Sequence, residues 1–584
     1  MDHLLEEFPG VSTAEWESAI ARDLKGADYE KRLIWRSEDG LAVKPYYRAE
    51  DLKDLVCMDA APGAFPYRRG TRTTGDWQIR EEIDATDLEG VNRAACAAVT
   101  GGAEGITFSR LLVERADELG AILTNLAEIP VHFEHADERL LRLLIDWLGN
   151  GRSAARVSMR VSSGCDATLS VDFAATVIGD APAGFVPFTI HGEEFKEAGG
   201  TAVEEIGFTV AAGVDFLAAM QDRGVNADRA AAALEFSFAM GSKTFSQIAK
   251  LRAFRMVWAR VIESFGGTRS GARARIATRT SRWNKTAYDP HVNILRATTE
   301  AMAAVLGGAD SVTVAPFDAC YKQPDEASQR LARNTQLLLK HEAWMGRVAD
   351  AGGGSYFIEA LTDFLACEGW KRMQEIEARG GYRKAQAEGL ISQTLKRSMA
   401  AREKAVALRR RVLVGTNQFA NPAERALGRV EAARMSETRR GARFYEEMRL
   451  RTERHAALTG QTPRVLLAEV GDEKMRTARS AFAANFFACA GFDTVTRRFR
   501  KAAEIAPAEE DLIVLCSADA EYAAIAAELM AKLKEIGRAT PVIVAGNPED
   551  AETLVAAGVA DFVHVRSNPV EVLTKWQERM GIKS

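Results

Sequence analysis

The sequence predicts an α/β protein with parallel sheets, and three patterns in its 584 residues indicate it. Residues 275–317 read as a strand over 276–280, a polar loop, an apolar helical stripe over 294–305 closed by Gly307-Gly308, and a second strand over 311–316. The same strand-loop-helix theme recurs between about residues 60 and 420. Short apolar runs then alternate with helical segments from residue 464 to the end. A helix between two successive strands makes those strands parallel, so both faces of each sheet should be covered.

The composition is typical of a soluble globular protein with two or more domains, at 47% hydrophobic and 27% charged residues. The net charge is −5, so no global basic field favours nucleic acid or an anionic membrane. The seven cysteines are scattered and show no CxxC spacing, which favours reduced thiols and a cytoplasmic location. No signal peptide and no run of roughly 18 apolar residues is present, so we expect no membrane span.

Residues 1–55 are predicted to form an N-terminal arm. Ser12 and Glu15 have capping-box spacing, a helical stripe follows, and Gly26 lies where a helix-ending glycine belongs. A hairpin is then expected over 32–35 and 41–47, joined by 37–40. The arm is too short to fold alone. It therefore docks either on a second subunit, through side chains such as Trp16 and Trp35, or as a strap on its own chain.

The repeated units of residues 56–420 predict a (β/α)₈ TIM barrel. Three of these units are recognisable at 185–217, 234–265 and 275–317. In such a barrel the chemistry lies at the carboxyl ends of the strands.

Residues 421–463 are predicted to be a helical linker. A basic run such as Arg439-Arg440 can contact phosphates, but helices of mixed charge are usually solvated or lie between two domains. Residues 464–584 predict a doubly wound, flavodoxin-like sheet. Its strands are expected at 465–470, 494–499, 512–516, 541–545 and 562–565, with ligands at the strand ends near 471–476 and Ser517.

Several blocks of the sequence resemble the methylmalonyl-CoA mutase family. They are Thr280-Ser281-Arg282-Trp283, Asp289-Pro290 with Asn293, Val305-Leu306-Gly307-Gly308, Ala332-Arg333-Asn334-Thr335-Gln336, Gly354-Ser355-Tyr356 and Gly415-Thr416-Asn417-Gln418-Phe419. The order of these blocks also matches, over nearly the whole chain. The resemblance implies a barrel followed by a cobalamin-binding-type domain, with an N-terminal segment that in the mutases helps to hold two subunits together.

One departure falls where catalytic members carry Gly-Tyr-His, with a tyrosine beside the radical path and a histidine on the thioester carbonyl. This chain has Gly192 followed by Glu193-Glu194. An ionised carboxylate has no proton to donate, and it would repel a malonyl-type carboxylate by about 4 kcal/mol at 4 Å. His191 would have to slide to replace the missing histidine, so a core or surface role is expected. In an extended backbone at most one of the two glutamates would enter the pocket.

A second departure lies earlier in the barrel. Catalytic members carry a tyrosine-containing Arg-Gly-x-Tyr loop before Trp-x-Ile-Arg, whereas Arg69 to Arg80 is shorter and has no aromatic residue between Gly70 and Trp77. Residues 162–187 also leave little room for a substrate-covering loop.

A third departure concerns the cofactor. Base-off cobalamin proteins carry Asp-x-His-x-x-Gly after the first strand of the C-terminal domain, and the histidine is the lower cobalt ligand. Here Lys474, Arg476 and Arg479 occupy this region, no histidine lies between His455 and His564, and cationic side chains cannot coordinate cobalt as they stand. His564, on the expected fifth strand, is wrongly placed for that role.

Two other candidates are weaker. His132 and His135 are spaced i, i+3 around Glu134, but no third metal ligand is apparent. Gly352-Gly353-Gly354 lacks the Lys-Ser/Thr of a phosphate loop, so a barrel turn is expected.

The departures favour a non-catalytic small subunit that pairs with a homologous large mutase subunit, which would bind adenosylcobalamin. No catalytic, cofactor-binding or metal-binding residue is then expected in this chain, and weak acyl-CoA binding stays open. Two alternatives are a free-standing regulatory or acyl-CoA-binding protein on a vestigial mutase fold and a diverged acyl-CoA mutase.

Overall fold

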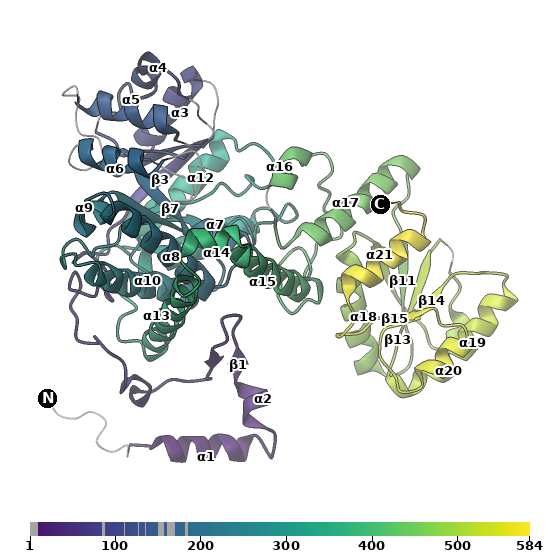
Figure 1. Cartoon of the computed structure of the whole chain (residues 1–584). Coiled ribbons are helices and arrows are strands. Elements are labelled where there is room, and N and C mark those ends of the chain that lie inside the picture. Colours follow the sequence, from purple (N-terminus) through teal and green to yellow (C-terminus); the bar gives the residue numbers. More distant parts are fainter. Residues whose placement is uncertain are drawn as a thin grey trace.

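The larger part of the molecule is a curled, eight-stranded parallel sheet (Figure 1). The computed structural model describes residues 10–84, 88–109, 111, 113–126, 128–134, 136–149, 157–159, 170–181, 185–437, 439–507 and 509–583. The strands are β3 (Gln78–Asp84), β4 (Gly105–Ser109), β5 (Val131–Phe133), β6 (Val157–Met159), β7 (Phe188–His191), β8 (Leu234–Met240), β9 (Ile276–Thr280) and β10 (Ser311–Thr313).

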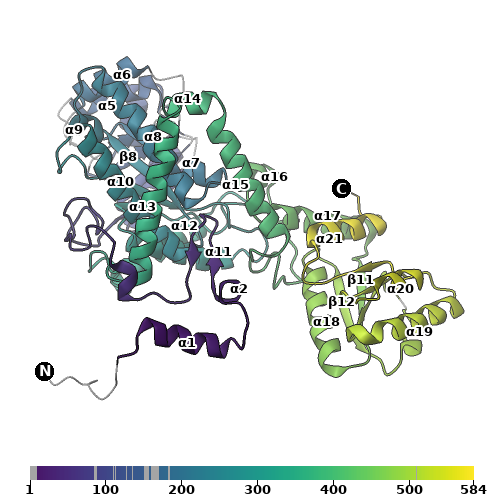
Figure 2. The same ribbon diagram turned by 60° about the horizontal axis from the view of Figure 1, so that its bottom comes forward.

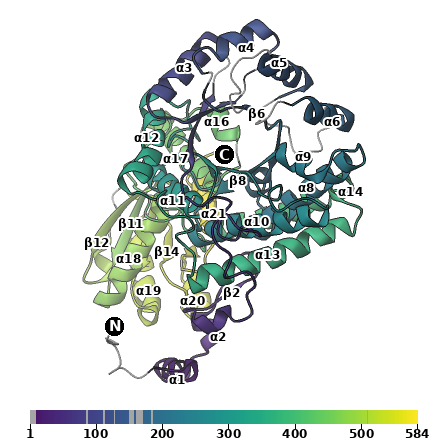
Figure 3. The same cartoon turned by 90° about the vertical axis from the view of Figure 1, so that its left-hand side faces the viewer.

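The strand order is β6-β5-β4-β3-β10-β9-β8-β7, so the last strand of the series, β10, pairs with the first, β3. β6 and β7, at the two ends of this order, also lie in contact. Helices surround the outside of the curled sheet (Figure 3). They are α3 (Leu88–Thr100), α4 (Ala116–Ile122), α5 (Glu138–Gly149), α6 (Val171–Asp180), α8 (Ala202–Gln221), α9 (Ala227–Ala232), α10 (Thr244–Ser264), α11 (Val292–Leu306), α12 (Glu326–Leu337), α13 (Tyr356–Glu377) and α14 (Tyr382–Ala387). The short helix α7 (Gly192–Glu197) directly follows the carboxyl end of β7, and α15 (Leu390–Ala407) runs from the large sheet toward the linker (Figure 1).

The stretch 275–317 forms the predicted strand-helix-strand unit, β9-α11-β10. Gly307 caps α11, and Gly308 follows with a φ of +78°, a conformation that favours glycine. β10 then runs parallel to β9, with Ser311 opposite Ala277. The prediction of parallel strands here is confirmed.

The N-terminal arm contains the predicted capping box, in which the Ser12 hydroxyl accepts from the Glu15 amide and the Glu15 carboxylate accepts from the Ser12 amide. The helix α1 (Thr13–Asp23) has no buried residue and lies apart from the helices of the large sheet (Figures 1 and 2). The first hairpin strand begins later than predicted, because α2 (Tyr29–Leu33), with Asp28 as its cap, covers the first two residues of the predicted strand 32–35. The antiparallel hairpin is β1 (Trp35–Arg36) with β2 (Ala42–Val43).

The linker region folds as two helices, α16 (Ala432–Glu437) and α17 (Arg443–Thr459). Of the two alternatives that the sequence leaves open, a solvated helix or a helix between two domains, α17 takes the second (Figure 1). Arg440 and Glu446 are buried and form an ion pair with N and O 2.6 Å apart. The helix α17 lies between the large sheet's loops and the five-stranded sheet (Figure 1), and Glu446, Arg449 and Glu453 on it are buried there.

The C-terminal sheet has five parallel strands in the order β12-β11-β13-β14-β15. The strands are β11 (Arg464–Glu469), β12 (Asp493–Arg498), β13 (Leu512–Cys516), β14 (Val542–Val544) and β15 (Asp561–Phe562), and the helices are α18 (Glu473–Ala488), α19 (Tyr522–Glu535), α20 (Ala551–Ala556) and α21 (Pro569–Arg579). All five strands fall where the sequence predicts them, to within a few residues. β15 is shorter than expected, and His564 lies beyond its end.

No helix in the described residues is long and apolar enough to cross a membrane. Cys57, Cys96, Cys320, Cys367, Cys489 and Cys516 carry free thiols.

Candidate functional site

Charged side chains fill the interior of the eight-stranded sheet. Arg80 on β3 donates two hydrogen bonds to Glu235 on β8, at 3.0 and 3.3 Å. Arg279 on β9 donates to Glu134, 2.9 Å away, and also pairs with Glu82. The described residues around these pairs enclose a cavity of about 30 Å³. That volume holds one or two water molecules rather than an acyl group.

The sequence analysis did not single out Arg80, Glu82, Glu235 and Arg279 as interior side chains. A partial signal for them exists, because residues two positions apart in a strand point to the same face of a sheet. Arg80 and Glu82 have this spacing on β3. Both line the cavity.

Glu193 lines the cavity, while Glu194 is exposed. The prediction that at most one of them enters is thus met, but not through an extended backbone, since both lie in the first turn of α7. His191 is a buried core histidine, with its Nδ1 3.0 Å from a Glu193 carboxylate oxygen. Gly192 is required sterically, because a Cβ atom there would lie 2.6 Å from the Thr209 hydroxyl.

The family-like blocks join loops at the carboxyl ends of the strands. The Glu197 carboxylate accepts from the Ser281 hydroxyl at 2.8 Å and from the Arg282 amide at 3.0 Å, which ties the loop after β7 to the loop after β9. The Asn293 side chain donates to the carbonyls of Thr286 and Phe317 at 2.8 and 2.9 Å. These blocks hold the loops together, a role that needs no catalytic residue.

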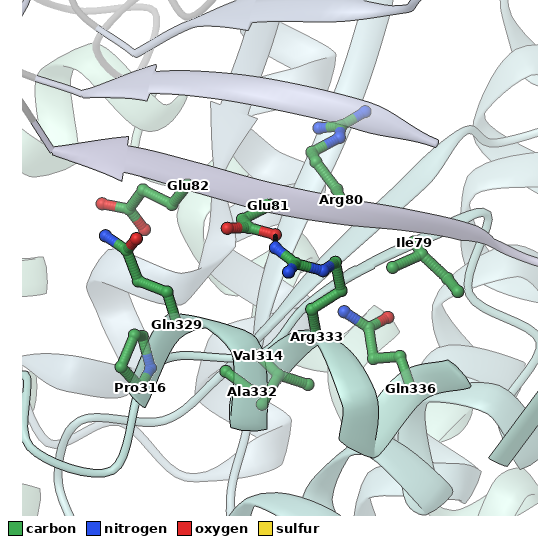
Figure 4. Close-up of a pocket in the computed structure, with 10 residues that line it drawn as sticks. All are labelled: Ile79, Arg80, Glu81, Glu82, Val314, Pro316, Gln329, Ala332, Arg333 and Gln336. Atoms are coloured by element: carbon green, nitrogen blue, oxygen red, sulfur yellow. Dashed lines mark hydrogen bonds and ion pairs between the residues drawn. The ribbon is translucent and has the colours of Figure 1, made fainter. Parts of the chain in front are cut away.

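The block that contains Arg333 packs α12 against β3. Figure 4 shows Arg333 and Glu81 reaching toward each other between these elements, with N and O 2.7 Å apart. Gln336 accepts from the Trp77 indole at 3.2 Å. Burial raises the pKa of Glu81, although Arg333 opposes this shift.

Two stretches that the sequence analysis considered separately meet in space. Arg69, at the start of the shortened loop, pairs with Asp350, 3.1 Å away, beside the glycine run 352–354. The Gly354 amide donates to Glu359 at 2.9 Å. The glycine run is therefore a turn that leads into α13, as predicted.

The carboxyl edge of the five-stranded sheet is occupied by the chain's own side chains. The Glu521 carboxylate accepts from the Ser517 hydroxyl at 2.5 Å and from the Asp472 amide at 3.0 Å. It also leaves no room for a side chain at Gly471, where a Cβ atom would lie 2.3 Å from its oxygen. The Ser517 hydrogen bond is the main reason that the pKa of Glu521 is lowered.

The three degenerate cofactor positions lie on α18, which begins directly after its cap Asp472. Lys474 is exposed in the first turn. Arg476 donates to the Gly471 carbonyl at 2.9 Å, and Arg479 forms two hydrogen bonds with Asp519 at 3.0 and 3.1 Å. None of these side chains is a neutral imidazole, and the two arginines are engaged within the chain.

The histidines offer no metal centre in the described part of the chain, where no group of three or more metal-ligand side chains occurs. His132 lies 3.9 Å from Glu235. His135 lies outside the described residues. The Nδ1 atom of His564 accepts from the Arg566 amide at 3.2 Å, and burial lowers the pKa of this histidine.

Comparison with known proteins agrees with these motifs. The family model described as methylmalonyl-CoA mutase matches residues 162–488. The chain is 35% identical to the methylmalonyl-CoA mutase small subunit of Porphyromonas gingivalis, with 100% of this chain and 99% of that protein covered. It is 33% identical to the small subunit of Streptomyces virginiae, over 99% and 98%. A methylmalonyl-CoA mutase of Rhizobium meliloti is 28% identical over 69% of this chain and 63% of its own length. The chain belongs to the methylmalonyl-CoA mutase family.

Proposed function

We propose that this chain is the non-catalytic small subunit of a heterodimeric methylmalonyl-CoA mutase. Its partner is a homologous large subunit that binds adenosylcobalamin and interconverts methylmalonyl-CoA and succinyl-CoA. Similarity over the full length to proteins named small subunit supports this assignment. The observation that carries the non-catalytic role is the filled interior, where ion pairs and Glu193 leave about 30 Å³.

The strand orders support a finer description of the fold. We assign residues 56–420 to a (β/α)₈ TIM barrel that closes between β6 and β7, after the arm of residues 1–55. The linker of residues 421–463 leads to a flavodoxin-like domain over 464–584. Its order, with the second strand outside the first and the third to fifth on the other side, is the one expected of that topology.

The residues of this chain do not fit base-off cobalamin, which supports placing adenosylcobalamin in the partner. The lower ligand would have to come from the segment after β11, where the side chains are those of an exposed lysine and two engaged arginines. Glu521 also fills the carboxyl edge of this sheet beside Gly471 and Asp472. Glu193 and Glu194, with Lys474, Arg476 and Arg479, are thus degenerate positions rather than site residues.

The central test compares the mutase activity of the isolated chain with that of its complex with the large subunit. Purified chain supplied with adenosylcobalamin should not isomerise methylmalonyl-CoA, and it should form a one-to-one complex with the large subunit that does. Isomerisation of any acyl-CoA by the chain alone would favour a diverged mutase. A chain that ignores the large subunit would favour a free-standing regulator. Calorimetry with coenzyme A on the same sample measures the weak acyl-CoA binding that we leave as a proposal.

The cofactor assignment has a separate test. Hydroxocobalamin is mixed with the chain and reduced, and the paramagnetic resonance spectrum is recorded. We expect no nitrogen hyperfine splitting from a protein imidazole. Such a splitting would contradict the assignment even if the chain proved inactive.

A further inference from the structure

A second polar pocket lies at the carboxyl ends of β7, β8 and β9, and the N-terminal hairpin reaches into it. Glu38, in the turn between β1 and β2, lies 3.1 Å from Lys243, 3.5 Å from Arg411 and 3.9 Å from Lys196. Arg402 on α15 completes the lining, and its guanidinium also stacks 4.4 Å from the centre of the Trp283 ring. Four cations, from α7, from the start of α10 and from the segment 402–411, thus surround one carboxylate.

The pocket has more positive charge than Glu38 neutralises. Among the described residues that line it, four are cationic and one is acidic. The nearest other carboxylates are engaged elsewhere: Glu197 with Ser281 and the Arg282 amide, and Glu205 with Lys250 at 2.8 Å. Although burial alone would raise the pKa of Glu38, the surrounding cations, Lys196 foremost, hold it well below its usual range. The environment therefore stabilises an anion strongly.

Hydrogen-bonding capacity is also left over in the pocket. Lys196, only 4% exposed, donates to the Gly200 carbonyl at 3.2 Å, which uses one of its three N–H groups. The buried Nε of Arg402 has no hydrogen-bond partner in the part of the chain that the structure describes. The remaining cavity is about 10 Å³, room for one water molecule at most. A larger anion can therefore enter only by replacing Glu38.

Glu38 lies on an element that the rest of the molecule holds weakly. No residue of α1 or α2 is buried, and Trp35 of the hairpin is 54% exposed. Besides Glu38, the hairpin turn is attached by Asp39, which accepts from the Val203 amide at 3.0 Å. Leu41 packs at the edge of the large core. The hairpin turn is therefore comparable to a ligand that is covalently attached to the chain that binds it.

We propose that this pocket is an oxyanion-binding site for a small phosphate-bearing molecule, and that Glu38 occupies the site in cis until the phosphate displaces it. A phosphate dianion matches four converging cations better than one carboxylate does, and both lysine and arginine bind phosphate through charge-assisted hydrogen bonds. The inference does not depend on the role as a small subunit, because it rests on the pocket alone.

The test uses the full chain and inorganic phosphate, with pyrophosphate as a second probe, in titration calorimetry at low chloride. Glu38→Gln removes the competing charge while keeping the shape. If the arm is docked about nine-tenths of the time, releasing it should strengthen the apparent affinity about tenfold. Glu30→Gln is the matched control, because Glu30 lies on the same arm at 66% side-chain exposure, away from the pocket. It should leave the affinity unchanged.

Adding Lys243→Met to Glu38→Gln should abolish the gain, and Arg411→Gln gives a second variant at a partly exposed position should the first fail to fold. In the wild-type chain, phosphate should raise hydrogen exchange over residues 35–43. The proposal is wrong if Glu38→Gln binds phosphate no more tightly than wild type, or if the gain survives loss of Lys243 and of Arg411. Release of the hairpin by the large subunit but not by either phosphate would identify a protein segment as the occupant, and would equally overturn the proposal.

Discussion

The connector helix α17 and the N-terminal arm both bring acidic side chains to the carboxyl ends of the large sheet, yet they are attached differently. Glu446 of α17 accepts from the Ala287 amide at 2.6 Å, and Glu453 accepts from the Tyr288 hydroxyl at 2.8 Å. On its other side, Thr452 donates to the Ala490 carbonyl at 2.6 Å. The arm is attached mainly through its hairpin, by Glu38, by Asp39 and by the Trp35 ring 5.4 Å from Lys243, and its helix α1 buries nothing.

We therefore expect α17 to be a fixed structural connection and the arm to be able to detach from the large sheet. Glu446 of α17 and its partner Arg440 are fully desolvated, so removing one of them leaves the other buried without compensation. Each cation around Glu38 has some access to water or a second partner, and even Lys196, whose ammonium is buried, donates to the Gly200 carbonyl. Loss of one charge in the connector should therefore destabilise the whole molecule, whereas the arm should be released while the large sheet stays folded.

The largest expected effect is on the connector. Glu446→Gln keeps the side chain's shape but leaves the Arg440 guanidinium buried and uncompensated, which should cost about 3–5 kcal/mol of stability. Urea unfolding followed by circular dichroism measures it. The control is Glu447→Gln at the next position, where an exposed glutamate lies 3.7 Å from Arg443 and the loss should stay below about 1 kcal/mol. Equal effects of the two substitutions would show that α17 is not a buried joint.

Sequence patterns captured the periodic part of this structure. The unit β9-α11-β10, the five C-terminal strands and the capping box at Ser12 each depend on residues within a few positions of one another. The family-like blocks gave the order of the larger elements as well. The predicted strand over 32–35 begins too early, because residues 32 and 33 are the end of α2, which Asp28 caps.

Contacts between distant segments could not be predicted in this way. Charged residues of mixed sign look alike in sequence whether they face water or a loop more than 150 positions away, as Glu446 faces Ala287. The degenerate positions could be found at Glu193 and Lys474 because they break a known motif. Glu38 breaks none, and its partners Lys196 and Arg411 come together only through the fold.

A change of pH should have a smaller effect on stability than Glu446→Gln, and it should act on the pocket around Glu38 but not on the Arg440–Glu446 pair. Burial, reinforced by the charge of Arg402, lowers the pKa of Lys196 to about 8. Its value in an unfolded chain is about 10.4, so between these pH values the unfolded state binds more protons and stability rises with pH, by at most about 1.4 kcal/mol per unit. The Glu446 pair offers no such change, because the pKa of Arg440 is raised: Glu446 outweighs the effect of burial.

The measurement compares wild type with Lys196→Met, which cannot titrate at this position. The difference in urea midpoint between the two proteins should shift in favour of wild type from pH 7.5 to pH 9.5. Over the same interval, exchange of residues 35–43, corrected for its intrinsic pH dependence, should increase because Glu38 loses one of its cations. A midpoint difference that is constant across this range would mean that Lys196 keeps its usual pKa.

The smallest effect within the isolated chain is expected at Trp16 on α1. Its side chain is 47% exposed and its ring lies 5.4 Å from that of Tyr46, a contact worth about 0.5–1.5 kcal/mol at most. Trp16→Ala should therefore leave the urea midpoint of the isolated chain nearly unchanged.

Exposed tryptophan is typical of surfaces that a partner covers, and loss of a tryptophan anchor often costs 2 kcal/mol or more, about thirtyfold in affinity. The same substitution should then weaken pairing with the large subunit, measured by calorimetry, while Val11→Ala on the exposed segment before α1 serves as a matched apolar control. Weaker pairing would assign α1 to the subunit contact and the hairpin to its own chain. Unchanged affinity would mean that the whole arm is an intramolecular strap. The arm and α17 would then differ only in how deeply their contacts are buried.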